Sequence, residues 1–245
     1  MTIQGSGHIF KRFDKEMDHL HSLVKEMGAL AVQQLEAAVK TLHEKDAAQA
    51  QKVIENDKLI NDLDIQADDE IVRIIALRAP MARDLREIIA VNKIVAELER
   101  SGDEARKIAG LTIRFYSSEH NPPSQAILED IYTLSEYVKE MLEMVMVALD
   151  DLDLSMANNV LNKGLKLDDK LQSILRRLST FIMEDSRNVG HFVDIVLGIR
   201  ALERFGGHAK NIAGHILFLK NGIDVRHEDV TFISEQIQNL ENNQS

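Results

Sequence analysis

Apolar side chains recur every three or four positions through most of the chain, which is the spacing of one face of an α-helix. The pattern is clearest between residues 20 and 42, where it comprises Leu20, Leu23, Val24, Met27, Leu30, Ala31, Leu35, Ala38, Val39 and Leu42. Comparable stripes span about residues 46–78, 81–116, 124–149, 155–183 and 189–220. The pattern therefore predicts six long amphipathic helices.

Helix-breaking sequences separate these stripes. Asp46 is a suitable N-cap for the second helix, and Pro80 ends that helix and can occupy the first turn of the next. "SSEHNPPSQ", residues 117–125, has the clearest linker composition. "EDSRNVG" separates the last two long helices, and "NGIDVRHED" precedes a predicted short terminal helix.

One phrase occurs twice. "LERSGDEARKIAG" covers residues 98–110, and "LERFGGHAKNIAG" begins 104 residues later (202 − 98), inside the third predicted helix of each half. We predict an all-α protein of two tandem three-helix bundles related by internal duplication. The expected divisions are a first repeat at 1–118, a linker at 119–124, a second repeat at 125–222 and a tail with a short helix at 223–245.

Composition restricts the class of protein. The formal net charge is −11, which disfavours nucleic acid as a partner, and without cysteine the chain has no disulfide, thiolate metal site or cysteine nucleophile. The first residues lack the apolar stretch of a signal peptide, and no window approaches the roughly 18 apolar residues of a membrane span. We expect a cytoplasmic protein.

Acidic side chains line two of the predicted helices. Glu99 and Asp103 are one turn apart, and the second helix carries Asp57, Asn61, Asp64 and Asp68 at steps of four, three and four. Like charges at this spacing repel, whereas a divalent cation would be bound by the same oxygen atoms. The spacing is compatible with a metal site and also with a solvated acidic face.

Other candidate motifs are incomplete. Glu16 and His19 form an E-x-x-H, but a di-iron site in a bundle needs a second one. His208 and His215 share a helix face and are weaker candidate ligands. The sequence contains no P-loop and no G-x-S-x-G nucleophile elbow. Three classes stay open at this point: a non-enzymatic bundle with bound metal, a metal-dependent bundle enzyme of di-iron type, and a helical scaffold without metal.

Several segments, in order, resemble the PhoU family of bacterial regulators of phosphate uptake. They are "MGALAVQQL", "RIIALRAPMARDLREI", "AELERSGDEARKIA", "FIMEDSR", "ALERFGGHAKNIA" and "DVRH". The resemblance covers about residues 10–227 and implies two similar three-helix bundles side by side, with dimers in several members.

The resemblance also implies metal ligands. Family members bind metal through an E(D)-x-x-x-D(N) motif on two helices of each bundle. The first bundle matches the motif with Asp57, Asn61, Glu99 and Asp103. The second matches it only with Asp168 and Glu203, because Gly164 and Gly207 replace the other two residues. We therefore expect a divalent or transition metal ion, such as Mg, Mn, Fe or Zn, in the first bundle and a weak or vacant site in the second.

The function implied by the resemblance is regulatory and not enzymatic. Family members repress the phosphate-starvation response when phosphate is plentiful. They are thought to link the ATPase subunit of the phosphate ABC transporter to a membrane sensor histidine kinase. The expected partners are these two proteins and a second copy of the chain, with the protein associated peripherally with membrane complexes.

Overall fold

A computed structural model describes residues 6–116, 123–184 and 189–222, and all of the regular structure in these ranges is helical. The helices are α1 (Ser6–Glu44), α2 (Ala47–Asn56), α3 (Lys58–Arg78), α4 (Arg83–Tyr116), α5 (Gln125–Asp151), α6 (Leu154–Glu184) and α7 (Val189–Asn221). The predicted all-α class is confirmed. The expected terminal helix, and most of the expected linker, lie outside the described residues.

The helices form because their apolar stripes become buried against one another. On α1, Leu20, Met27 and Leu35 are almost completely inaccessible to solvent. Asp46 caps α2 as predicted, since its side chain accepts a hydrogen bond from the backbone N–H of Gln49 at 2.9 Å. Each stripe alone would be exposed, so the fold is stabilised by packing between helices more than by helix propensity.

Two local predictions need correction. The second predicted helix is divided in two, because Asp57 lies in a turn between α2 and α3. Its carbonyl oxygen still accepts from the N–H groups of Ile60 and Asn61, so the interruption is short. Pro80 lies in the connection between α3 and α4 and not in the first turn of α4, which starts at Arg83.

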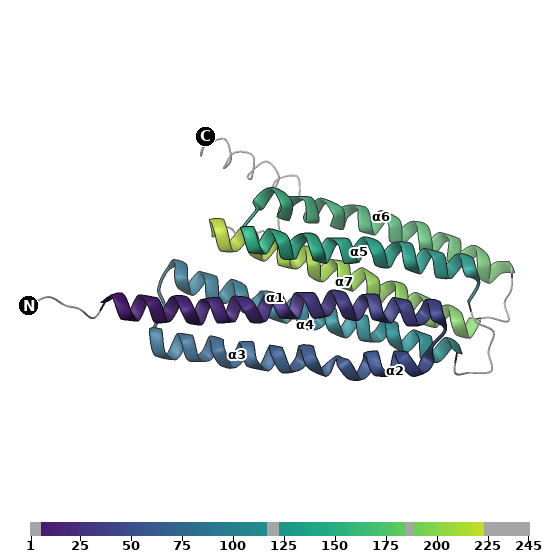
Figure 1. Cartoon of the computed structure of the whole chain (residues 1–245). Coiled ribbons are helices and arrows are strands. Elements are labelled where there is room, and N and C mark those ends of the chain that lie inside the picture. The colour runs from purple at the N-terminus through teal and green to yellow at the C-terminus, as the bar shows by residue number, and fades with distance from the viewer. Residues whose placement is uncertain (1–5, 117–122, 185–188, 223–245) are drawn as a thin grey trace, which may run out of the picture.

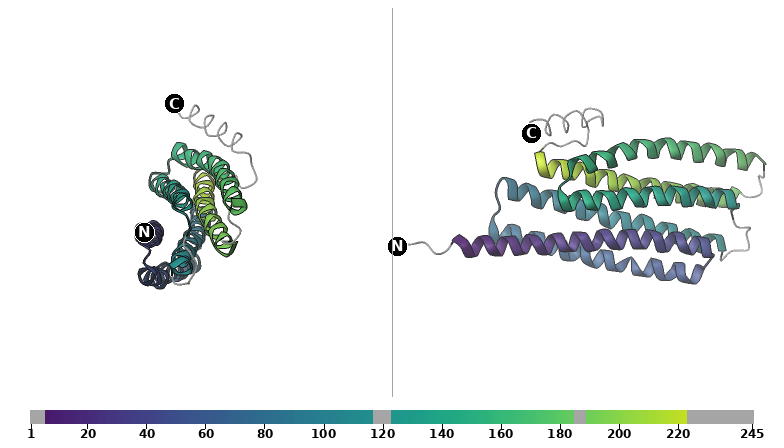
Figure 2. Two further views of the ribbon diagram at one scale, coloured as in Figure 1. Left: turned by 90° about the vertical axis from the view of Figure 1, so that its right-hand side faces the viewer. Right: turned by 45° about the horizontal axis from the view of Figure 1, so that its top comes forward.

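The molecule consists of two three-helix bundles lying side by side with their helices nearly aligned (Figures 1 and 2). The first contains α1, α2–α3 and α4, and the second contains α5, α6 and α7. The most extensive contact between the bundles joins α4 to α7, with a smaller one between α1 and α5. Because Glu104 pairs with Arg204 and Arg114 with Asp194, α4 and α7 run antiparallel.

The internal duplication is visible in the packing. Gly102 on α4 lies so close to α3 that a Cβ there would be 2.7 Å from Cδ1 of Ile60. The equivalent Gly206 on α7 lies equally close to α6, where its Cβ would be 2.5 Å from Cδ2 of Leu167. The repeated glycine thus makes the same close helix approach in both bundles, which explains why both copies of the phrase keep it.

None of the described helices has a stretch that is both long and apolar enough to cross a membrane.

Candidate metal centre

The predicted ligands of the first bundle lie where α2–α3 packs against α4. Asp57 is buried at the α2–α3 junction, and Asn61 follows one turn later on the exposed side of α3. Glu99 and Asp103 are partly exposed on the facing side of α4. The structure therefore brings the two halves of the motif to one region, as the sequence predicted for two helices of one bundle.

A cationic side chain already joins two of these carboxylates. The Nη2 atom of Arg106 donates to Oδ1 of Asp103 at 2.6 Å. Its Nε atom lies 3.2 Å from Oδ2 of Asp57, as an ion pair without hydrogen-bond geometry. The other oxygen of Asp57 accepts a hydrogen bond from Nε2 of Gln34 at 2.9 Å. Both oxygen atoms of Asp57 thus face protein groups.

The remaining acidic groups in this region lie among other carboxylates, and Arg100 offsets only part of their effect on Glu99. Burial raises the pKa of Glu99, and the nearby carboxylates of Asp103, Asp64 and Asp57 raise it further. Burial also raises the pKa of Asp64, with a contribution from Asp68. Burial is the main cause of both shifts, and the neighbouring carboxylates that add to it lie close together between α3 and α4, where they could attract a cation.

The fit to a metal ion is therefore partial. Carboxylate and amide oxygens are suitable donors for a hard cation, and the local charge has the right sign. However, among the described residues no group of three or more His, Asp or Glu side chains is placed to hold a metal ion. A cation that bound both Asp57 and Asp103 would take the place that the Arg106 guanidinium has in this structure.

The equivalent position in the second bundle is arranged differently. Gly164 replaces Asp57, and a Cβ there would lie 2.9 Å from Cδ of Lys210. Lys210 is the duplicate of Arg106 (106 + 104), so its aliphatic stem covers the position at which the first bundle has a carboxylate. Gly207 replaces Asp103, and a Cβ there would have no neighbour within 4 Å.

The two carboxylates left in the second bundle are also less suited to bind metal. Asp168 is exposed on α6. Glu203 on α7 accepts a hydrogen bond from Nη1 of Arg200 at 2.5 Å. With two glycines in the motif and a lysine across it, the donor set is smaller and the local charge less negative than in the first bundle.

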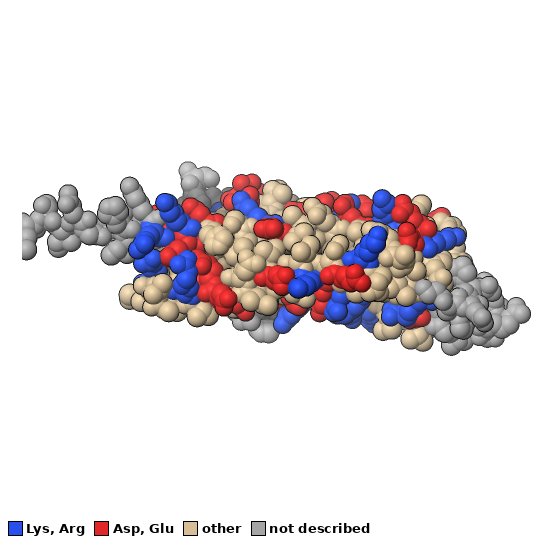
Figure 3. All heavy atoms as spheres, turned by 60° about the horizontal axis from the view of Figure 1, so that its bottom comes forward, with Lys and Arg blue, Asp and Glu red and all other residues tan. Residues whose placement is uncertain are grey.

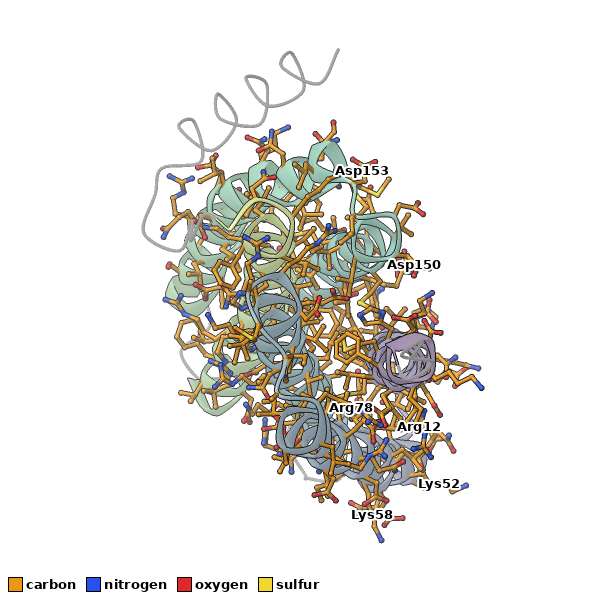
Figure 4. All side chains as sticks on the ribbon, turned by 90° about the vertical axis from the view of Figure 1, so that its left-hand side faces the viewer. Arg12, Lys52, Lys58, Arg78, Asp150 and Asp153 are labelled. Atoms are coloured by element: carbon orange, nitrogen blue, oxygen red, sulfur yellow. The ribbon has the colours of Figure 1, made fainter. Side chains whose placement is uncertain are left out.

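The weaker sequence candidates have structural partners instead. Oε1 and Oε2 of Glu16 accept two hydrogen bonds from Arg78, both at 2.8 Å, and Arg73 lies 3.5 Å away. These bonds lower the pKa of Glu16, with Arg12 contributing as a further positive charge. Arg12 and Arg78 lie together at this end of the first bundle (Figure 4). His215 is buried in α7.

His208 contributes to a polar contact between the bundles that the sequence did not reveal. Its Nδ1 atom lies 2.6 Å from Oε2 of Glu97, and Nδ2 of Asn211 donates to the same oxygen at 3.2 Å. Burial alone would raise the pKa of Glu97, but the hydrogen bonds from His208 and Asn211 outweigh it, so the pKa lies below its usual value.

A second buried carboxylate, Glu104, lies two turns further along the same face of α4. Glu104 accepts hydrogen bonds from Nε and Nη2 of Arg204 at 2.7 and 2.8 Å, and from Lys107 at 2.9 Å. These bonds outweigh the effect of burial and lower its pKa. One signal could have indicated both residues, since Glu97 and Glu104 fall within the apolar spacing of α4 between Ile94 and Ile108.

Comparison with known proteins agrees with this architecture. The PhoU domain matches twice, over residues 24–112 and 131–216. A "Phosphate-specific transport system accessory protein PhoU homolog" from Pseudomonas aeruginosa is 35% identical over 232 residues, which are 95% of each chain. The "Phosphate-specific transport system accessory protein PhoU" of Escherichia coli is 34% identical over 220 residues, 90% of each chain.

Solved structures show the same fold. The crystal structure of PhoU from Pseudomonas aeruginosa superposes with a TM-score of 0.80 at 34% identity, covering 86% of this chain and all of that one. The phosphate transport system regulatory protein PhoU from Streptococcus pneumoniae gives a TM-score of 0.78 at 24% identity, covering 87% of this chain and 99% of that one. With two domain matches and full-length relatives, this chain belongs to the PhoU family.

Proposed function

We propose that this protein is a cytoplasmic negative regulator of the phosphate-starvation response. In this role it links the ATPase subunit of the phosphate ABC transporter to a membrane sensor histidine kinase. The observation that carries the proposal is the match to relatives named as accessory proteins of the phosphate-specific transport system over nine tenths of both chains. Those names support a role in the regulation of phosphate transport, and the link between two partners is our inference.

The arrangement of the bundles is suited to an adaptor. Buried hydrogen bonds of Glu97 and Glu104 join α4 to α7, so the bundles can act as one rigid body. Each bundle has an outer surface formed by different helices, which allows two partners to bind at once. The relatives are named as accessory or regulatory proteins and not as enzymes, and we expect no catalytic turnover. Self-association to a homodimer belongs to the same proposal.

We further propose that the first bundle binds a divalent or transition metal ion. Glu99 and Asp103 on α4, with Asp57 and Asn61 on the facing helices, would supply the oxygen ligands. The support is that these carboxylates lie together where α3 faces α4, with the pKa of Glu99 raised first by burial and then by the nearby carboxylates. Binding would require Arg106 to leave Asp57 and Asp103. We expect the second bundle, with Asp168 and Glu203 alone, to bind weakly.

A deletion strain tests the proposed function. In a strain without a second homologue, removal of this gene should leave alkaline phosphatase expressed in phosphate-rich medium, and a plasmid copy should restore repression. Normal repression in the deletion strain would refute the regulatory role. An alternative, a metal-dependent oxidase, would instead show oxygen consumption by the purified metal-loaded protein.

A further inference from the structure

The exposed large apolar side chains are concentrated on α3, the connection that follows it and the start of α4. Of the twelve such residues among the described side chains, eight fall between positions 59 and 89. They are Leu59, Ile65, Val72, Ile75, Leu77, Met81, Leu85 and Ile89. Figure 3 shows the α3 side of the molecule, where uncharged surface continues between acidic and basic side chains. Exposed apolar surface that is concentrated in this way is typical of an interaction site.

The centre of this surface is the outer face of α3. Ile65 and Val72 are 59% and 66% exposed, and they lie two helical turns apart. Ala76, also exposed, follows one turn later on the same face. We call these three residues the α3 outer stripe. Positions i, i+7 and i+11 lie along one side of an α-helix. A stripe with this spacing is therefore suited to pack along the apolar stripe of a second helix.

Charge indicates the kind of helix. Asp62, Asp68 and Asp69 are exposed beside the stripe, and none of them forms an ion pair with another residue in the described part of the chain. The basic residues of α3 are Lys58, Arg73 and Arg78, of which Arg73 pairs with Glu70 and Arg78 with Glu16. The stripe between Ile65 and Val72 is therefore flanked by negative charge that is unpaired among the described residues, and a complementary surface there would be apolar with basic flanks.

We propose that the α3 outer stripe binds a basic amphipathic helix of a protein partner. A second copy of this chain is disfavoured as the occupant, since a twofold contact would place the same acidic flanks against each other. An anionic membrane surface would be repelled by the same carboxylates. The inference rests on the proposed adaptor function, for which it names one docking surface and the chemistry of the segment that binds there.

Peptide binding tests the proposal directly. The probe is a fluorescent amphipathic peptide of about 18 residues with Leu on one face and Lys on the other, and its twin has Glu in place of Lys. The intact protein should bind the Lys peptide and not the Glu twin. Ile65→Gln with Val72→Gln should weaken binding about tenfold or more. Val193→Gln with Leu197→Gln is the matched control, since those residues are 54% and 51% exposed on α7.

A second pair of variants separates local from overall charge. Asp62→Asn with Asp69→Asn should weaken binding of the Lys peptide severalfold. Glu129→Gln with Glu143→Gln removes the same charge from the exposed face of α5 and should have little effect. If both pairs weaken binding equally, only net charge attracts the peptide, and if neither does, the acidic flanks have no role; either result would contradict the proposal.

Other occupants give different results. If the wild-type protein is a dimer in sedimentation and the Ile65→Gln, Val72→Gln variant is a monomer, the stripe binds a second copy and our assignment is wrong. If the wild type floats with vesicles containing phosphatidylserine and this variant does not, the stripe binds a membrane surface and our assignment is also wrong.

Complementation of the deletion strain separates this proposal from the proposed function. If the wild-type gene restores repression and the stripe variant does so equally well, the docking surface is wrong and the function stands. If the wild-type gene does not restore repression, the function is wrong, whatever the peptide assay shows.

Discussion

Arg106 and Lys210 hold equivalent positions in the two bundles, and each lies across the first motif position of its own bundle. Arg106 contacts the carboxylate of Asp57, whereas the stem of Lys210 covers Gly164. Both bundles therefore have the basic residue, and only the first has the acid. A cation must compete with Arg106 in the first bundle, but in the second it meets a lysine without the carboxylate.

This relationship predicts the effect of neutralising each basic residue. Arg106→Gln should increase the affinity of the first bundle for Mn²⁺ by about tenfold, because it removes the guanidinium that holds Asp57 and Asp103. Isothermal titration of metal-stripped protein measures the change. Lys210→Gln, the matched control, should leave that affinity unchanged. A loss of affinity in Arg106→Gln would mean that Arg106 supports the site and does not compete for it.

The adjacent glycines of α7 should respond oppositely to alanine. Gly207→Ala should stabilise the protein by about 0.5–1 kcal/mol, because the helix gains a better helix former and the new Cβ has no neighbour within 4 Å. Gly206→Ala should destabilise it by about 1–3 kcal/mol, since the Cβ would lie 2.5 Å from Leu167 and 3.0 Å from Val138. Urea denaturation distinguishes the two, and equal effects would contradict the packing of α7 on α6.

Acidification should weaken the contact between the bundles. The folded-state pKa of Glu97 is lowered, so its stabilising effect is present above the unfolded-state pKa and is lost as the pH falls through the folded-state value. The free energy of unfolding should therefore decline between about pH 5 and pH 3. Glu97→Gln should make this decline shallower, as measured by urea midpoints at each pH. Glu99→Gln is the control and should not make the decline shallower. The pKa of Glu99 is raised, so its protonation at low pH favours the folded state.

The ion pair of Arg204 with Glu104 should also contribute to stability. Arg204→Met leaves a buried carboxylate with only Lys107 as a partner and should cost about 1–3 kcal/mol. Adding Glu104→Gln should recover part of this loss, because no buried charge is then left unpaired. Thermal denaturation of the single and double variants gives the coupling. If the double variant loses as much stability as Arg204→Met and Glu104→Gln lose separately when summed, the pair does not stabilise the contact between the bundles.

The sequence predicted the helices well because each stripe follows from local spacing. The bounds of α5, α6 and α7 lie within about two residues of those expected, and the repeated phrase correctly indicated two bundles. The break at Asp57 was missed because no glycine or proline marks it. Local patterns reveal such a turn only weakly when the apolar stripe continues on both sides.

Long-range contacts were beyond sequence reasoning. Arg106 reaches Asp57 from 49 positions along the chain (106 − 57), and Glu97 meets His208 from 111 positions away. The spacing of Glu99 and Asp103 identified an acidic face, but not the arginine that shares it. Such pairs depend on how α4 packs against α3 and α7, which the pattern of a single helix does not specify.

The inequivalence of the bundles is tested most directly by metal stoichiometry. Protein purified without an affinity tag and equilibrated with Mn²⁺ should lose most of its bound metal in the variant with Glu99→Ala and Asp103→Ala. The variant with Asp168→Ala and Glu203→Ala should lose little, because its bundle already lacks two of the four motif side chains. Equal losses in the two variants would show that the second bundle binds metal despite Gly164 and Gly207, and would contradict the account.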